Sequence, residues 1–143
     1  MCKKIVIILV LLTGMAFAET KFISLFIGDH EFNVEIADTQ QKQILGLMYR
    51  DSIPDDYGML FTYHNEDTRS MWMKNCLIHL DLVFLDKNRE VVDMYINVPP
   101  CKEDPCASYM SRRRAQYVLE LRGNRAKELN LKIGDSIFFV LPE

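Results

Sequence analysis

The chain has 143 residues, of which 17 are lysine or arginine and 20 are aspartate or glutamate. This length fits one ordinary domain with its own core, and the acidic balance argues against nucleic acid as a partner. The triplet Arg112–Arg114 is the only basic cluster in the sequence, and three charges in a polar stretch are typical of a solvated loop.

The first 18 residues have the order of a secretory signal peptide. Two lysines precede an apolar run over 5–17, and small residues at Ala16 and Ala18 mark the expected cleavage site. The alternative is an uncleaved membrane anchor, but a spanning helix needs roughly 20 apolar residues, more than this run provides. We therefore expect a mature chain of residues 19–143 that is periplasmic or secreted and has no stable membrane span.

Residues 19–143 predict a mainly β fold. Eight short strands are expected, at 22–27, 32–37, 59–63, 69–73, 78–85, 90–96, 116–121 and 136–141. One short helix should begin after Asp38, capped by that residue, and end near Gly46 or Met48, with Ile44 and Leu47 on a shared face. A second short helix is expected at 125–129. Together these elements predict a single sandwich, jelly-roll-like or barrel-like domain.

Four cysteines are present, and an exported protein can form disulfides. Cys101 and Cys106 enclose four residues directly after two prolines, which favours a disulfide that holds a tight loop. Zinc is a weaker interpretation, because zinc pairs usually have closer spacing and need further ligands, so no metal site is predicted. Cys76 is then the odd thiol, either a buried small side chain or a reactive group.

Two acidic residues lie inside apolar strands. Asp81 follows Leu80 in a strand that is otherwise apolar on both faces, and Glu120 lies on the face of Val118. A carboxylate in such a setting either has a raised pKa or finds a cation or several hydrogen-bond donors, and Lys74 and Arg50 are the candidate cations. For Glu120 we favour a structural role in which it accepts hydrogen bonds from loop amides. For Asp81 a structural and a functional role are equally supported.

Four ordered sequence blocks resemble the domain of unknown function 192 family, also called uncharacterised protein family 0127. The blocks are Gly46-Leu47-Met48-Tyr49-Arg50, Gly58-Met59-Leu60-Phe61, Trp72-Met73-Lys74-Asn75 with Leu80-Asp81, and Tyr117-Val118-Leu119-Glu120-Leu121 before Lys132-Ile133-Gly134-Asp135. The resemblance implies a compact, mainly β domain that is often exported and has no established catalytic activity. The sequence departs from the family pattern at Leu45, Cys76 and His79, where arginine, threonine and proline are usual.

Two functions are favoured equally by the sequence. One is a binding module for a small polar ligand such as a sugar or envelope fragment, because an aromatic face with an amide, a cation and a carboxylate suits such ligands. Its candidate residues are Arg50, Trp72, Lys74, Asn75, Asp81 and Glu120, with the Cys101–Cys106 loop and Tyr109 as a roof. The other is a structural or interaction domain whose partner is an envelope protein.

Two further alternatives remain open. A hydrolase-like enzyme could use Asp81 or Glu120 as general acid or base, although the usual catalytic motifs are missing and no cofactor is predicted. Whether both carboxylates face one cavity would discriminate this alternative from binding. Soft-metal handling is the other alternative, because Met71 and Met73 share a strand face and thioethers favour Cu(I). Methionine is also an ordinary core residue.

Overall fold

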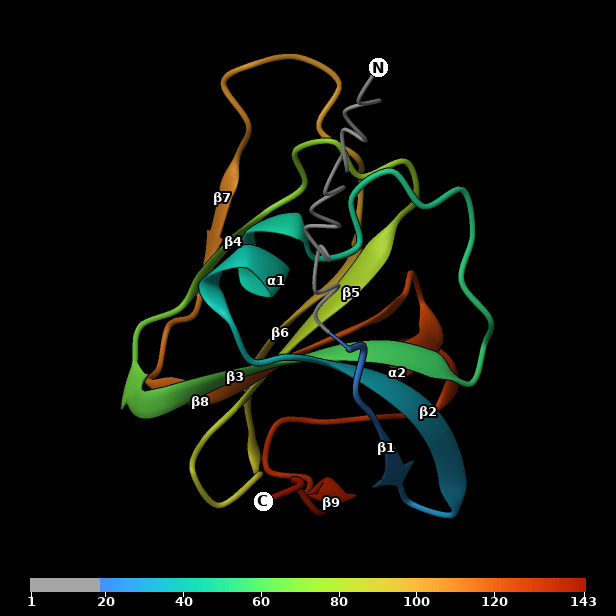
Figure 1. Cartoon of the computed structure of the whole chain (residues 1–143), viewed down its shortest axis with the longest axis vertical. Coiled ribbons are helices and arrows are strands. Elements are labelled where there is room, and N and C mark those ends of the chain that lie inside the picture. Colours follow the sequence, from blue (N-terminus) through green and yellow to red (C-terminus); the bar gives the residue numbers. More distant parts are fainter. Residues whose placement is uncertain (1–18) are drawn as a thin grey trace, which may run out of the picture.

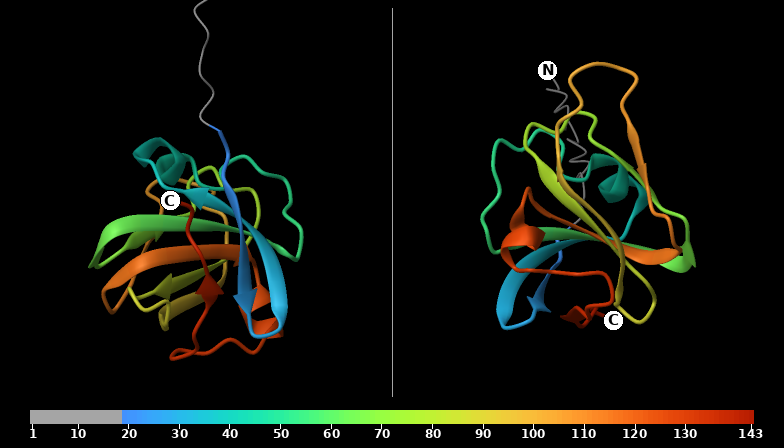
Figure 2. Two further views of the ribbon diagram at one scale, coloured as in Figure 1. Left: turned by 60° about the horizontal axis from the view of Figure 1, so that its bottom comes forward. Right: turned by 180° about the vertical axis from the view of Figure 1, so that it is seen from behind.

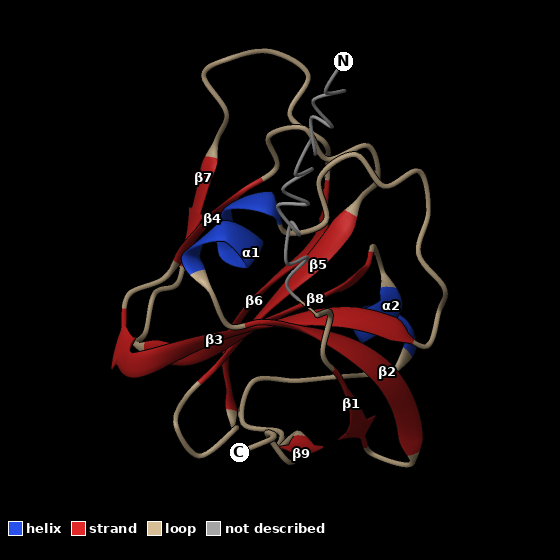
Figure 3. Cartoon of the chain, in the orientation of Figure 1, coloured by secondary structure: helices blue, strands red, loops and turns tan. Residues whose placement is uncertain are grey.

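The computed structural model describes residues 19–143, and the predicted signal peptide at 1–18 lies outside the described residues. The strands are β1 (Phe22–Ile27), β2 (His30–Ala37), β3 (Tyr57–Asp67), β4 (Ser70–Trp72), β5 (Leu80–Leu85), β6 (Val91–Val98), β7 (Ser108–Met110), β8 (Ala115–Arg122) and β9 (Phe138–Phe139). The helices are α1 (Gln40–Leu45) and α2 (Arg125–Glu128), and Figure 3 shows how small a part of the fold they form. The prediction of a mainly β fold with one or two short helices is confirmed.

Most strands belong to one sheet, in the order β6-β5-β8-β3-β2-β1-β9, while β4 pairs with β7 in a second sheet. Neighbouring strands run antiparallel except β2 and β3, which are parallel. A parallel connection needs a crossover rather than a tight turn, and α1 lies in this crossover. Figures 1 and 2 show the large sheet curling into an open half-barrel, with α1 outside its strands.

The curled sheet buries apolar side chains on both faces. All six residues of β5 are buried, with Leu80, Leu82 and Phe84 in one apolar cluster and Val83 and Leu85 in the other. This alternation agrees with the face assignment made from the sequence. The apolar side chains of β8 belong to the same two clusters. Glu120 shares a face of β8 with Val118, so it points toward the cluster that contains Leu82.

The start of α1 differs from the prediction. Thr39, not Asp38, caps the helix, and its side chain accepts a hydrogen bond from the Lys42 backbone N–H. Asp38 instead pairs with Lys21 and Lys42. Burial opposes ionisation of Asp38, but hydrogen bonds from these two lysines outweigh it and hold the pKa of the carboxyl group below its usual range.

The shared face expected for Ile44 and Leu47 does not form within α1, because the helix ends at Leu45. No residue of this helix is buried: Ile44 is 59% exposed and Leu45 is 53% exposed, whereas Leu47 beyond the helix is buried. α1 therefore presents apolar side chains to its surroundings instead of packing them on the sheet.

Three strands differ most from the prediction. β3 extends to Asp67 rather than ending at residue 63, because its irregular pairing with β8 resumes beyond a bulge. β7 was absent from the predicted strands, and β9 is shorter than the predicted strand at 136–141. Within residues 19–143, no helix combines the length and apolar character needed to cross a membrane.

Candidate functional site

Glu120 lies in the middle of the large sheet with its carboxyl group buried. The residue is 3% exposed, and its neighbours in register are Met59 of β3 and Leu82 of β5. Its Oε2 atom has no hydrogen-bond partner, and it is the only buried side-chain oxygen or nitrogen of residues 19–143 in this condition. The expectation that Glu120 accepts hydrogen bonds from loop amides is therefore wrong.

Burial changes the protonation of this group. Loss of hydration raises the pKa of Glu120 to about 8, and the charge of Arg50 only partly opposes the shift. At neutral pH the carboxyl group is therefore mostly protonated. A protonated carboxyl group can donate a hydrogen bond as well as accept one.

A small pocket opens above Glu120. Its volume is about 20 Å³, enough for one water-sized group. The lining residues come from α1 and the segment after it, β3, β4 with the turn that follows, and β8. They are Gln43, Ile44, Leu45, Gly46, Leu47, Met48, Phe61, Met71, Trp72, Lys74, Cys76 and Glu120. Most of this lining is apolar, and the rim residue Trp72 is 48% exposed.

Gly46 brings the end of α1 close to the carboxyl group. Its φ is +47°, a conformation that residues with a side chain rarely adopt. A Cβ atom at this position would lie 3.2 Å from the Phe61 ring and 3.8 Å from Oε2 of Glu120. Only glycine therefore lets the backbone pass over the ring at this distance and form one side of the pocket.

Cys76 also lines the pocket and is buried. Burial raises the pKa of its thiol to about 11, and the nearby Glu120 adds to the shift. Since the thiolate is the nucleophilic form, the thiol is suppressed as a nucleophile at neutral pH. The interpretation of Cys76 as a buried small side chain is the one that this environment favours.

Asp81 has a structural role. Its carboxylate accepts hydrogen bonds from the backbone N–H groups of Asn97 (2.7 Å), Asn124 (2.8 Å) and Ala126 (2.7 Å). These contacts tie β5 to the end of β6 and to the start of α2. Lys74, one of the candidate partners of Asp81, pairs with Asp104 instead.

Asp81 and Glu120 also lie on opposite faces of the sheet. Asp81 is in register with Leu121, whereas Glu120 is in register with Leu82, and these two leucines belong to different apolar clusters. The two carboxyl groups therefore do not face one cavity, which was the geometric condition for a paired acid and base.

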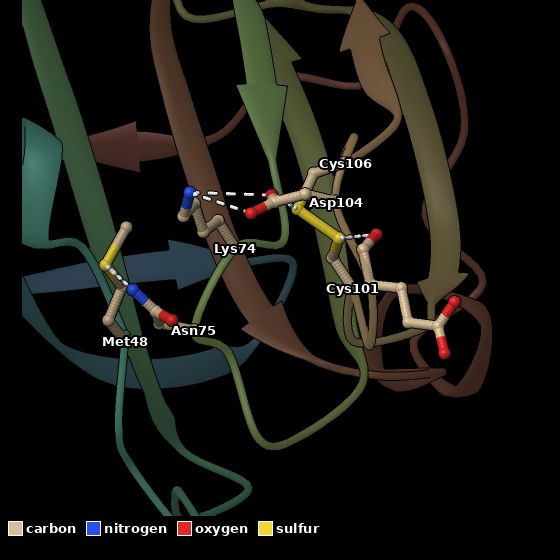
Figure 4. Close-up of a disulfide and its surroundings, with 7 residues drawn as sticks. Met48, Lys74, Asn75, Cys101, Asp104 and Cys106 are labelled. Atoms are coloured by element: carbon tan, nitrogen blue, oxygen red, sulfur yellow. Dashed lines mark hydrogen bonds and ion pairs between the residues drawn. A yellow bond between two sulfur atoms is a disulfide. The ribbon is translucent and has the colours of Figure 1, made fainter.

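Lys74 lies at the rim of the pocket, between Trp72 and the cysteine loop. Its Nζ atom is 5.5 Å from the centroid of the Trp72 ring and 3.4 Å from Oδ2 of Asp104. The sulfur atoms of Cys101 and Cys106 are 2.12 Å apart, the predicted disulfide pairing. Figure 4 shows Lys74 reaching toward Asp104 beside these two sulfur atoms.

Asn75 points away from Lys74 and toward the other side of the pocket. Its side-chain amide lies 3.8 Å from the sulfur of Met48. Figure 4 shows the two side chains pointing toward each other. Its backbone carbonyl accepts a hydrogen bond of 2.8 Å from the Tyr49 N–H. Asn75 thus joins the segment after β4 to the segment after α1, and it does not line the pocket over Glu120.

Arg50 and Tyr109 lie outside the pocket as well. The Arg50 guanidinium is 2.7 Å from a Glu35 carboxylate oxygen and donates to the Tyr57 hydroxyl at 2.6 Å. Tyr109 lines a separate hollow of about 190 Å³ with residues of the cysteine loop. Of the residues predicted from the sequence, the structure therefore brings together Trp72, Lys74 and Glu120, but not Arg50, Asn75, Asp81 or Tyr109.

Met71 and Met73 are both buried in the apolar cluster around Leu82. Core packing accounts for both side chains, so the arrangement gives the copper alternative no support.

The contribution of α1 and Gly46 to the site was not predicted from the sequence. A glycine directly after a short helix was a usable signal, because it allows a positive φ. Leu45 and Cys76, two of the three departures from the family pattern, both line the pocket.

Comparison with known proteins identifies related sequences. Residues 23–139 match the family DUF192, described as "Uncharacterized ACR". The chain is 32% identical to a UPF0127 protein of Thermococcus sibiricus over 112 residues, covering 77% of this chain and 68% of that protein. It is 28% identical to a UPF0127 protein of Pyrococcus furiosus over 109 residues, covering 73% and 84%.

Two solved structures have a similar fold. One is a candidate transcription regulator from Sinorhizobium meliloti, with a TM-score of 0.75, 31% identity, and coverage of 85% of this chain and 94% of that one. The other is a protein of unknown function from Novosphingobium aromaticivorans, with a TM-score of 0.75, 28% identity, and coverage of 87% and 89%.

Proposed function

The chain belongs to the DUF192 family, whose description assigns no reaction, and we propose that it is an exported domain that binds a small ligand in the pocket over Glu120. The observation that carries this proposal is the buried carboxyl oxygen without a partner. Burying a polar group without a hydrogen bond destabilises the fold, so such a group needs a reason. A ligand that enters the pocket would supply the missing partner.

The rim of the pocket supports binding rather than a purely structural role. Ile44, Leu45 and Trp72 are each about half exposed and all line the pocket opening. Apolar side chains grouped beside a buried polar atom are typical of small-molecule sites. The exposed Trp72 ring adds a flat apolar surface at this opening.

Binding is better supported than catalysis. The carboxyl groups of Asp81 and Glu120 lie on opposite faces of the sheet, and Asp81 is fully engaged by backbone amides. The raised pKa of Cys76 removes a thiolate nucleophile from the same pocket. The regulator assignment of the Sinorhizobium meliloti structure is not carried over, because the acidic balance of this chain disfavours nucleic acid.

Export rests on the signal-like sequence at 1–18 and on the cysteine pair at disulfide distance, which an oxidising compartment allows. Fractionation of expressing cells, followed by N-terminal sequencing, tests this part. We expect an exported chain that begins at Glu19. An unprocessed chain in the cytoplasmic fraction would contradict export.

Native mass spectrometry of protein purified gently from an exporting host tests ligand binding. We expect a retained small mass that is lost in Trp72→Ala. Phe138→Ala is the matched control, because Phe138 is also an exposed aromatic residue but lies on β9, away from the pocket. A bare polypeptide mass, or a retained compound that survives Trp72→Ala, would contradict the proposal.

A further inference from the structure

The pocket over Glu120 combines a buried carboxyl group, a cation at the rim and exposed apolar side chains. Resting on the proposed function, we infer that its ligand is a small aliphatic acid bound through its carboxylate. One carboxylate oxygen accepts a hydrogen bond from the Glu120 carboxyl group, Lys74 supplies the opposite charge, and the hydrocarbon chain covers the apolar rim.

The size and depth of the pocket limit what can reach Glu120. The space of about 20 Å³ admits a single oxygen-sized group, so a whole sugar ring does not fit. Glu120, whose buried Oε2 atom has no hydrogen-bond partner, is one of the residues that line this space. A protonated carboxyl group that donates to a carboxylate forms a short, charge-assisted hydrogen bond, which is stronger than a bond to a neutral oxygen.

The charge of the lining favours an anion. Lys74 is its only basic residue and Glu120 its only carboxylic acid, and Glu120 is mostly neutral at pH 7. Lys74 is held only loosely, because its partner Asp104 has a side chain that is 71% exposed and lies 3.4 Å away. A cationic ligand would meet the Lys74 ammonium and find no ionised partner at the bottom of the pocket.

The rim suits a hydrocarbon chain rather than a polar body. Ile44 and Leu45 of α1 and Trp72 of β4 border the opening and remain about half exposed. Each methylene group buried against such a surface strengthens binding roughly fourfold. Affinity should therefore rise steeply with chain length.

Fluorescence of Trp72 tests the inference directly, because it is the only tryptophan in the chain and lies at the rim. The probes are hexanoate, butanoate, hexan-1-ol and hexylamine, each titrated at pH 6 and pH 9. We expect hexanoate to bind at least tenfold more tightly than butanoate, and more tightly than the alcohol or the amine. Its affinity should fall about tenfold at pH 9, where Glu120 with a pKa of about 8 ionises.

Three groups near Glu120 keep their protonation state between these pH values. Burial raises the pKa values of Tyr63 and Cys76, so both stay neutral, and despite its burial the hydrogen bond to Glu35 raises the pKa of Arg50, so it stays cationic. Glu120→Gln keeps an N–H donor but cannot ionise. We therefore expect this variant to bind hexanoate equally at both pH values, whereas the unaltered protein does not.

Lys74→Met should weaken hexanoate binding by about tenfold. Lys102→Met removes the same charge from the exposed part of the cysteine loop and should have no effect. Equal binding of the alcohol or the amine, or hexanoate binding that does not depend on pH, would overturn the inference. If such probes still change Trp72 fluorescence, the proposed binding function survives with another ligand class. If no probe changes Trp72 fluorescence and the purified protein retains no small mass, both the inference and the proposed binding function are wrong.

Discussion

Replacing Glu120 with glutamine should alter how the stability of the protein depends on pH. The folded state raises the pKa of Glu120 from 4.5 to about 8, so the folded protein holds this proton more tightly than the unfolded chain. The free energy of unfolding therefore decreases as pH rises from about 4.5 to about 8 and levels off above that range. Glutamine has a similar shape and no charge, so the variant should lack this decrease.

The size of the effect follows from the shift. One pKa unit corresponds to about 1.4 kcal/mol, so the full shift amounts to about 5 kcal/mol. The space above the carboxyl group admits one water, which lowers the cost of the charged form. We therefore expect Glu120→Gln to exceed the unaltered protein in stability by about 2 to 5 kcal/mol at pH 9. At pH 5 the two should differ by less than about 1 kcal/mol.

Urea unfolding at pH 5, 7 and 9 measures these differences. Other acids with shifted pKa values, such as Asp38 and Asp93, are present in both proteins and cancel in the comparison. Glu90→Gln is the matched control, because Glu90 is exposed and its variant should follow the unaltered protein at every pH. Parallel pH profiles for the unaltered protein and Glu120→Gln would refute the account of Glu120 as a buried, mostly neutral acid.

Three further predictions concern the rest of the site and its support. Asp81→Asn should lower the free energy of unfolding by about 2 to 4 kcal/mol, because one amide oxygen replaces two carboxylate oxygens that accept three backbone N–H groups. In urea unfolding the exposed control Asp67→Asn should change stability by less than about 0.5 kcal/mol, and equal losses would contradict the structural role of Asp81. Cys76 should react with iodoacetamide at pH 8 far more slowly in the folded than in the unfolded protein, and equal rates measured by mass spectrometry would contradict its burial. In the double variant Cys101→Ser, Cys106→Ser the free energy of unfolding should fall by only about 2 kcal/mol in urea unfolding, because the enclosed loop is short. Failure of this variant to fold would contradict a role of the disulfide that is confined to the loop.

The strands that could be predicted are those whose pattern is local. The run from Leu80 to Leu85 has apolar side chains on both faces, and this pattern correctly indicated a strand buried on both sides. The parallel pairing of β2 with β3 could not be predicted, because it depends on where α1 returns the chain. The short strand β7 has no pattern of its own and forms only because β4 pairs with it.

The roles of the two buried acids could not be assigned from the sequence. Asp81 accepts hydrogen bonds from amides that lie between 16 and 45 residues away along the chain, so its neighbours in sequence gave no indication of them. Glu120 has apolar neighbours in register on both adjacent strands, and no amide reaches it. The sequence showed that both acids needed an explanation, but only the topology determined which acid had partners.

Lys74 was correctly placed near Trp72, because the two residues are close in sequence, and their separation in space is 5.5 Å from Nζ to the ring centroid. Its partner Asp104 could not be predicted, since the cysteine loop reaches Lys74 only through the pairing of Lys74 with Cys101. The exposed apolar residues of α1 were missed for a similar reason. An amphipathic pattern normally indicates a buried face, but here the helix lies outside the sheet.

Chemical-shift mapping by NMR tests most directly whether the pocket over Glu120 is a binding site. The backbone amides and the Trp72 indole would be followed while small alcohols, amides, carboxylates and sugars are added one at a time. We predict that at least one compound class shifts the Gly46 and Leu47 amides together with the Trp72 indole, because these groups line the same pocket. Shifts confined to other surfaces, or no shift with any compound, would contradict the proposed function.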